Sequence, residues 1–329
     1  MDEMRAIFDC RLVEEERKIL SVLPSYESEF VPIDVSFAED QKIWTISVNT
    51  GSSNTPIVLL HGFAASLGFW CLNFEPLSRD RPLYAIDILG FGRSSRPHFS
   101  DNNLEVERQM VEAIEAWRKQ MKIEKMILLG HSMGAYLSGL YSMTHPERIQ
   151  HLILVDAWGY SDKYEKPSIL LKILSFIFCK VDPLEIIRWM GPQWGPFVML
   201  KTVPDIFVKV GDKLNDQSIL PKYCFYCNAS QEPTGEKAFY SLILGLGWAK
   251  SPLIKRMHKL DKNISITVLY GSDTVMDSQM GPRIKALTPD SFVDIKVVDK
   301  AWHHIYSENA NQFNEIVLNA CQFADQKKL

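Results

Sequence analysis

Short apolar runs alternate with longer segments of helical periodicity along most of this chain. From Pro56 onward the runs are apolar on both faces, which is typical of strands in a parallel sheet covered by helices on both sides. The segment 103–121 shows the alternative pattern, with apolar residues at helical spacing and a charged outer face. We therefore predict an α/β protein with a mostly parallel, eight-stranded sheet. The expected strands lie within residues 30–37, 42–49, 56–63, 82–92, 125–132, 151–160, 264–271 and 291–301.

Two segments interrupt this alternation. Residues 1–25 are highly charged and predict one amphipathic helix. Residues 161–260 contain no clear strand but are rich in Trp, Phe, Leu, Ile and Pro, and a structureless loop of this length is implausible. Because ligands of α/β proteins bind at the carboxyl ends of the strands, we expect 161–260 to form a helical cap there, with the core made of 26–160 and 261–329.

Composition narrows the classes of partner and compartment. The 329 residues carry a formal net charge of −4, which argues against nucleic acid as a partner. Six scattered cysteines favour a reduced, intracellular protein over a disulfide framework. The first residues are too charged for a secretory signal, and the longest apolar segment, 168–179, is interrupted by Lys172 and too short to span a bilayer. We expect a cytoplasmic protein.

The stretch "KMILLGHSMGAYLSGL" passes from a strand pattern into a helix pattern through Gly-x-Ser-x-Gly. This is the signature of a nucleophile elbow, a tight strand-to-helix turn that exposes a serine at the edge of a sheet. Ser132 is the candidate nucleophile. The next residue, Met133, is expected to offer its backbone N–H to an oxyanion.

A serine nucleophile needs a histidine base, and the chain contains eight histidines. The string "AWHHIYSE" follows the last expected strand, where a triad histidine belongs, and we prefer His303 to His304. His61 opens "HGFAAS", a turn that supplies the other oxyanion donor, expected here to be the N–H of Phe63. The remaining histidines are expected to be structural: His98, His131, His145, His151 and His258.

The triad acid is expected after the penultimate strand, in "GSDTVMDS". Many hydrolases of this kind place the acid three residues after the glycine, where this chain has Thr274. Asp273 lies one position earlier and Asp277 three positions later. Spacing leaves the choice between these two aspartates open.

Several strings together resemble the abhydrolase domain-containing 4/5 subfamily of α/β hydrolases, over residues 13–323. They are "IVLLHG", "AIDILGFGRSSRP", "MILLGHSMG", "RIQHLILVDAWGY", "GWAKSP", "YGSDTVMDS" and "HHIYSE". The resemblance implies an α/β-hydrolase fold with the cap inserted after strand 6, and it assigns Asp277 as the acid and His303 as the base. One branch of the subfamily keeps the serine and deacylates N-acylphosphatidylethanolamine and its lyso form. The other has asparagine there and is a coactivator of a triacylglycerol lipase at lipid droplets.

Ser132 favours the hydrolase branch, although the chain departs from the family pattern in three respects. Ala135 stands where a second glycine is usual, and Glu308 ends a His-x-x-x-x-Asp string that is proposed as an acyltransferase signature in the family. The tryptophan-rich droplet anchor of the coactivator branch has no counterpart in residues 1–30.

The expected function is hydrolysis of acyl esters in phospholipids or related glycerolipids through an acyl-enzyme on Ser132, without a metal or organic cofactor. His61, Gly62 and Trp158 are expected to contact the substrate. The alternatives are a droplet-associated lipase coactivator and an acyl-CoA-dependent lysophosphatidic acid acyltransferase. Peripheral association with membranes or droplets is expected through the cap, whose apolar side chains either dip into lipid or line an acyl tunnel. These side chains are Trp189, Trp194, Phe197 and those of 168–179.

Overall fold

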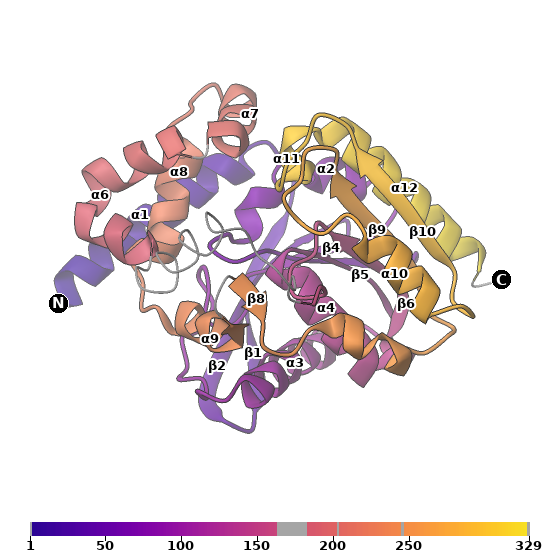
Figure 1. Ribbon diagram of the computed structural model, residues 1–329. Helices are drawn as coiled ribbons and strands as arrows, with labels where there is room; N and C mark the ends of the chain where they lie inside the picture. Colours follow the sequence, from indigo (N-terminus) through magenta and orange to yellow (C-terminus); the bar gives the residue numbers. More distant parts are fainter. Residues whose placement is uncertain (1, 163–182, 203, 245–246, 328–329) are drawn as a thin grey trace, which may run out of the picture.

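The computed structural model describes residues 2–162, 183–202, 204–244 and 247–327 (Figure 1). Its centre is an eight-stranded sheet with strand order β1-β2-β4-β3-β5-β6-β9-β10. The strands are β1 (Glu27–Val35), β2 (Ala38–Val48), β3 (Ile57–Leu60), β4 (Leu83–Ile86), β5 (Met126–His131), β6 (Ile149–Val155), β9 (Ser265–Gly271) and β10 (Val293–Val298). All eight coincide with strands predicted from the apolar pattern.

Pairing in this sheet is antiparallel at one edge and parallel elsewhere. β2 pairs antiparallel with both β1 and β4, and the strands from β4 to β10 pair in parallel. The carboxyl ends of β3, β5, β6 and β9 therefore meet at the same edge, where an α/β sheet binds its ligands. The predicted α/β-hydrolase fold, with a mostly parallel eight-stranded sheet, is confirmed.

Apolar side chains alternate between the two faces of the strands and build a core on each side. On β5, Leu128 packs into the core beneath α3 and α4, whereas Ile127 and Leu129 pack into the core beneath α1 and α12. The helices around the sheet are α1 (Asp2–Leu20), α2 (Phe74–Leu77), α3 (Asn103–Gln120), α4 (Met133–Thr144), α10 (Met280–Leu287), α11 (Ile305–Glu308) and α12 (Ala310–Gln326). Four short helical turns complete this part: η1 (Leu67–Trp70), η2 (Pro146–Arg148), η5 (Leu253–Lys255) and η6 (Met257–Lys259).

The described part of the segment after β6 is mainly helical (Figure 1). Its Phe239 and Gly247 contact Phe63 and Trp158, in the loops that follow β3 and β6 at the carboxyl edge of the sheet. We call the described part, residues 183–249, the cap. It comprises α6 (Pro183–Thr202), α7 (Pro204–Leu214), α8 (Ile219–Cys224), η3 (Phe225–Ala229), α9 (Thr234–Leu242) and a small hairpin of β7 (Ile243–Leu244) and β8 (Trp248–Ala249). The apolar run 168–179 lies outside the described residues.

A buried carboxylate joins the first helix, the sheet and the cap. Glu16 on α1 accepts hydrogen bonds from Trp44 Nε1 on β2 at 3.1 Å and from Tyr223 Oη on α8 at 3.1 Å. It also accepts one from Arg93 Nη1 at 2.6 Å, in the loop after β4. Burial raises the pKa of Glu16, against the lowering effect of Arg93. Because a buried charge is tolerated only when it is paired, this cluster fastens α1 and α8 to the core.

No described helix is both long and apolar enough to cross a membrane.

Candidate active site

The turn from β5 into α4 has the geometry of a nucleophile elbow. Ser132 has φ 52° and ψ −114°, a strained conformation for a residue with a side chain, and it is 8% exposed. The flanking glycines allow the strand and helix to approach closely. A Cβ on Gly130 would lie 2.2 Å from the carbonyl oxygen of Gly134, and one on Gly134 would lie 2.3 Å from that of Leu60. The chain therefore holds a serine at the carboxyl edge of the sheet, as the motif predicts.

Two backbone N–H groups beside this serine are free to donate. Met133 is the first residue of α4, so its N–H has no partner within the helix. Phe63 follows β3 in the neighbouring turn, and a Cβ on the preceding Gly62 would lie 3.2 Å from Ser132 Cβ. Across the part of the chain that the structure describes, neither N–H donates a hydrogen bond. Both groups, with the positive end of the α4 dipole, are able to stabilise negative charge.

His303, in the turn between β10 and α11, is held by a carboxylate. Its Nδ1 lies 2.5 Å from Oδ2 of Asp156, whose residue is fully buried, while the His303 side chain is 20% exposed. The carbonyl oxygen of His303 lies 2.9 Å from Nε2 of His131, the residue before the serine. Since Asp156 Oδ2 accepts only, Nδ1 carries the proton, which leaves Nε2 of His303 as the basic nitrogen.

Asp156 comes from the end of β6 and not from the segment after β9. It has φ 41°, its N–H donates to the carbonyl of Leu269 at 2.7 Å, and its Oδ2 also accepts from Thr274 Oγ1 at 2.8 Å. Thr274 occupies the position three residues after Gly271 at which many hydrolases of this fold carry the acid. A hydroxyl at that position therefore supports a carboxylate that is supplied by the adjacent strand.

The aspartates expected as the acid lie elsewhere. Asp277 Oδ2 accepts from Ser161 Oγ at 2.6 Å and lies 3.7 Å from Arg283 Nη1, while its Oδ1 accepts from the N–H of Gln279 at 2.9 Å. Asp273 Oδ2 accepts from the neighbouring Ser272 hydroxyl. The contact to His303 Nδ1 thus belongs to Asp156, and the geometry favours it over the Asp277 that the resemblance implies. The reason is that β6 and β9 are neighbours whose ends reach the same place.

The residues expected to contact substrate fall into two groups. His61 is 1% exposed, and both ring nitrogens are occupied: Nε2 accepts from the N–H of Ile88 at 3.0 Å, so Nδ1 carries the proton toward the carbonyl of Gly62 at 2.8 Å. Burial lowers its pKa to about 4, so the ring stays neutral and supports the turn. Gly62 lies against Ser132, as described above, and its missing side chain leaves the space that the elbow needs.

Trp158 is half-buried, in the loop after β6 beside the elbow. Its backbone N–H lies 3.3 Å from the carbonyl oxygen of Ser132, and its indole N–H donates to the carbonyl of Gly247 in the cap. Its ring packs against Phe239 of α9 with centroids 4.7 Å apart, and Phe239 stacks on Phe63 at 4.4 Å. We call Phe63, Trp158 and Phe239 the aromatic wall. Phe239 is buried, whereas Phe63 and Trp158 are half-buried and leave part of the wall accessible near the elbow.

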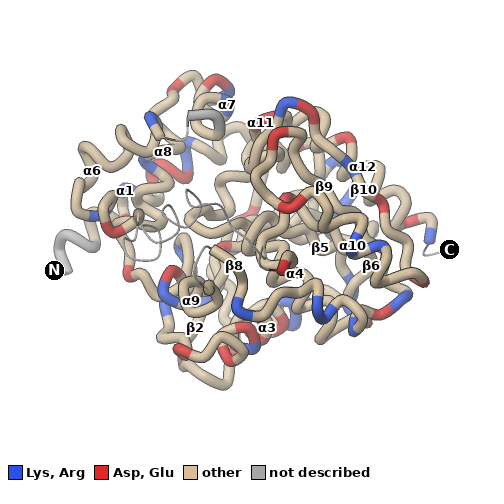
Figure 2. Tube along the Cα trace, in the orientation of Figure 1, with Lys and Arg blue, Asp and Glu red and all other residues tan. Residues whose placement is uncertain are grey.

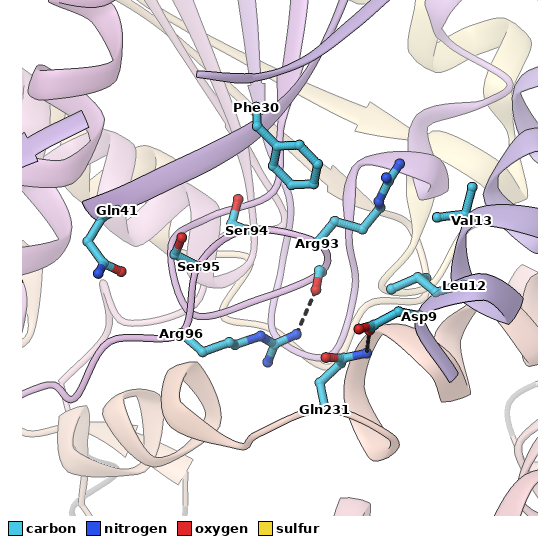
Figure 3. A pocket seen from close by; sticks show the side chains of 11 residues that line it. Asp9, Leu12, Val13, Phe30, Gln41, Arg93, Ser94, Ser95, Arg96 and Gln231 are labelled. Carbon is cyan, nitrogen blue, oxygen red and sulfur yellow. Dashed lines mark hydrogen bonds between the residues drawn. The ribbon is translucent and has the colours of Figure 1, made fainter. Parts of the chain in front are cut away.

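A cavity of about 530 Å³ lies elsewhere, between α1, the β1–β2 hairpin and the loop after β4 (Figure 3). Its two arginines have structural roles. Arg93 pairs with Glu16 and lies 3.7 Å over the Trp44 ring, and Arg96 donates to the carbonyl oxygens of Gly90, Gly92, Cys227 and Glu232. Neither Ser132 nor His303 lines this cavity, so we assign the chemistry to the elbow.

Sequence reasoning missed Asp156 and the support given by Thr274. The signal for the first lay in "HLILVDAWGY", where an aspartate directly follows a strand at the carboxyl edge. The signal for the second was a threonine at the usual acid position.

Among the described residues, no cluster of three or more His, Cys, Asp or Glu is placed to hold a metal ion.

Comparison with known proteins agrees with the fold. A family model described as "alpha/beta hydrolase fold" matches residues 55–176. A (lyso)-N-acylphosphatidylethanolamine lipase of Homo sapiens is 39% identical over 311 residues, which are 92% of this chain and 90% of that protein. A 1-acylglycerol-3-phosphate O-acyltransferase, ABHD5 of Mus musculus, is 39% identical over 322 residues, covering 95% of this chain and 90% of that protein.

Solved structures share the fold at much lower identity. A naproxen esterase from Bacillus subtilis superposes with a TM-score of 0.68 at 17% identity, over 94% of this chain and 96% of that one. A bacterial membrane phospholipase A superposes with a TM-score of 0.66 at 17% identity, over 98% of this chain and 92% of that one.

Proposed function

This chain belongs to the α/β-hydrolase family, within the group that contains a (lyso)-N-acylphosphatidylethanolamine lipase and a 1-acylglycerol-3-phosphate O-acyltransferase, and we propose that it is a serine hydrolase of glycerophospholipid acyl esters. Ser132 is the nucleophile, His303 the base and Asp156 the acid that orients the base. The N–H groups of Phe63 and Met133 form the oxyanion hole.

The observation that carries this proposal is the contact between His303 and Asp156 in the turns next to the elbow. A strained serine, two N–H donors and a histidine held by a carboxylate come from loops that follow four strands of the sheet at its carboxyl edge. A structural turn needs none of these groups. Their convergence supports acyl transfer through a covalent intermediate.

The reaction proceeds in two steps. Ser132 Oγ attacks the ester carbonyl as His303 Nε2 takes its proton, and the tetrahedral oxyanion accepts hydrogen bonds from the two N–H groups, each worth about 3 kcal/mol in related enzymes. His303 then returns the proton to the departing glycerol oxygen, which leaves an acyl group on the serine. A water molecule, deprotonated by His303, releases the fatty acid and restores the enzyme.

The surroundings of the serine support a lipid substrate. The aromatic wall gives an apolar surface against which an acyl chain packs, and burial of such a chain contributes about 0.8 kcal/mol per CH₂ group. One relative is named as a lipase of (lyso)-N-acylphosphatidylethanolamine, so we propose phospholipids of this class as the first substrates to test.

Helix α6 supports peripheral association with a lipid surface. Trp189 is 87% exposed, Trp194 64% and Phe197 51%, which is unusual for residues of this size. Tryptophan and phenylalanine favour the boundary between water and lipid, where an amphipathic helix lies in the plane of the surface. Between Arg188 and Lys201, helix α6 has no charged residue, and Figure 2 shows this helix at the outer end of the molecule. We propose that this face meets a membrane or a lipid droplet.

Acyl transfer to a lysophospholipid is a second candidate. It is favoured by a relative of equal identity that is named as a 1-acylglycerol-3-phosphate O-acyltransferase. In this case acyl-CoA acylates Ser132 and releases the CoA thiol, and the hydroxyl of the lysophospholipid, deprotonated by His303, takes the acyl group in place of water. A third candidate is a coactivator that binds a triacylglycerol lipase, for which the serine is dispensable.

The proposal is tested by labelling the purified protein with a fluorophosphonate, which reacts with activated serines. We expect labelling of the wild type and loss of labelling in Ser132→Ala and His303→Ala. Ser142→Ala is the matched control, because Ser142 is a buried serine of α4 whose hydroxyl donates to the carbonyl of Ser138 within the same helix. Fatty-acid release from lyso-N-acylphosphatidylethanolamine is then followed in the same variants.

The outcomes separate the three candidates. Serine-dependent release of fatty acid supports the hydrolase, whereas serine-dependent transfer from acyl-CoA to 1-acylglycerol-3-phosphate, without release, supports the acyltransferase. A folded wild-type protein that is not labelled contradicts both. Stimulation of a triacylglycerol lipase by Ser132→Ala as strong as by wild type then supports the coactivator.

A further inference from the structure

His131 lies between the glycine and the serine of the elbow, and its side chain points into the protein. The residue is the last of β5 and is 2% exposed. Its ring lies 4.9 Å from that of Tyr306 and 4.7 Å from that of His303, measured between centroids. A histidine that only fills space is common in a core, so its hydrogen bonds decide its role.

The hydrogen bond of His131 fixes its tautomer. Nε2 lies 2.9 Å from the carbonyl oxygen of His303, and a carbonyl only accepts, so Nε2 carries the proton. Nδ1 is buried and has no hydrogen-bond partner among the described residues. Burial and the neighbouring imidazoles hold the pKa of His131 well below its usual range. The side chain is therefore a neutral donor aimed at one backbone atom.

Three segments of the proposed active site meet at this ring. His131 is covalently next to Ser132, and its Nε2 donates to the base-bearing turn at His303. On the third side, a Cβ on Gly62 would lie only 2.7 Å from His131 Nδ1, so the ring also packs against the turn that carries the Phe63 N–H. One imidazole thus contacts the nucleophile segment, the base segment and the oxyanion segment.

We propose that His131 is a positioning residue for the hydrolysis assigned above, and this inference rests on that proposed function. Asp156 holds the imidazole of His303 from its Nδ1 side, but a hydrogen bond to a ring leaves the backbone that carries the ring unfixed. The bond from His131 fixes that backbone relative to the serine. Displacement of a reacting group by about 1 Å costs on the order of 100-fold in rate, so this one bond contributes to kcat.

Neutrality of the neighbouring rings is part of the same arrangement. During catalysis His303 becomes an imidazolium, and a second positive ring at 4.7 Å would oppose it. His131 stays neutral, as does His304, whose ring lies 5.1 Å from that of His303 and whose pKa burial lowers to about 3. Positive charge therefore forms at His303 alone among these three rings.

Two amide variants test the hydrogen bond apart from the volume of the ring. The amide nitrogen of glutamine reaches about as far as histidine Nε2, whereas that of asparagine stops near Nδ1. We expect His131→Asn to lower kcat by about 10- to 100-fold with KM little changed, and His131→Gln to recover most of the loss. His151→Asn is the stability control, because His151 is also buried and its Nε2 lies 2.8 Å from Thr267 Oγ1 on β9, away from the elbow segments.

The result is read from kcat and from thermal unfolding of all variants. Recovery in His131→Gln, with His151→Asn destabilised but catalytically intact, supports the inference. Wild-type kcat in a folded His131→Asn overturns it, and so does an equal loss in both amide variants at equal stability, because reach would then not matter. Retained hydrolysis in Ser132→Ala would instead contradict the proposed function itself.

Discussion

The carboxyl edge of the sheet and the outer face of helix α6 differ in which side chains they bury and which they expose. At the edge, polar groups are buried and bound: Asp156 is fully buried yet contacts both His303 and Thr274. On α6, large apolar rings face solvent, with Trp189 87% exposed and Trp194 64% exposed. Burying polar groups and exposing large apolar rings both cost free energy of folding. The two arrangements are therefore consistent with the proposed roles, which are chemistry at the edge and a binding surface on the helix.

The largest expected effect separates two aspartates at the edge. Asp156→Asn removes the acceptor that fixes the His303 tautomer, and we expect kcat for ester hydrolysis to fall by about 10⁴-fold, as for such changes in other triads. Asp277→Asn is the matched control, since Asp277 bonds Ser161 and the N–H of Gln279. A larger loss in the control would return the role of acid to Asp277.

The second effect concerns stability and pH. Asp87, buried at the end of β4, accepts the N–H groups of Leu67 and Arg93, but desolvation, followed by the charge of Glu16, raises its pKa to about 7. The folded state then binds the proton more tightly than the unfolded state, so stability falls as the pH rises from about 4 to about 7, by about 4 kcal/mol for this group.

This pH dependence is measured by denaturant unfolding at pH 5 and pH 8. Asp87→Asn replaces an acceptor of two N–H groups and lowers stability at both pH values, but it lacks the titrating proton. We expect a smaller difference between the two pH values in the variant than in wild type. An unchanged difference would mean that Asp87 does not bind a proton in this range.

The third effect tests the α6 face. Replacing Trp189 and Trp194 together with alanine removes two exposed rings, and we expect binding to phosphatidylcholine vesicles to weaken by at least about 100-fold. Hydrolysis of a short, water-soluble ester and the melting temperature are expected to stay near wild type, because the rings lie outside the core. Unchanged vesicle binding would remove α6 as the lipid contact.

The smallest effect concerns the hydroxyl that supports the acid. Thr274→Val keeps the shape of the side chain and removes both the hydrogen bond to Asp156 and the one accepted from the N–H of Met276. We expect kcat to fall by about 5- to 10-fold, which corresponds to the 1 kcal/mol or so of one hydrogen bond. Thr288→Val is the control, because that buried hydroxyl bonds only a helix carbonyl, that of Ile284. Equal kcat in the two variants would assign no support to Thr274.

Most of the fold was predictable because the pattern of apolar runs repeats throughout the core. The elbow turn was also predictable, since Gly-x-Ser-x-Gly is a local signal, and so was the position of His303 after the last strand. The carboxylate that contacts His303 was not predictable, because β6 and β9 pair in register, with Val155 opposite Leu269, so that an aspartate after either strand can reach the same point. Only spatial proximity distinguishes Asp156 from Asp277.

The exposure of α6 could not be read from the sequence for a different reason. A segment rich in Trp, Phe and Pro has the same composition whether these side chains line a tunnel or face solvent. The apolar residues of this segment also lack a helical period that would show which side of the helix is buried. In the structure α6 contains Gly191 with φ 73°, which kinks the helix between Trp189 and Trp194. The part that follows the kink carries the exposed Trp194 and Phe197.

The residues that hold His303 have a consequence for motion in this molecule. Asp156, Thr274 and His131 all belong to strand ends or adjoining loops of the core, and none of them lies in the cap. The contacts that hold His303 therefore do not depend on the cap, and a displacement of α6 is expected to leave the base in place. The turn that carries the Phe63 N–H is coupled to the cap, because Phe63 stacks on Phe239 of α9. Movement of the cap is thus expected to reach the proposed oxyanion donor before it reaches the base.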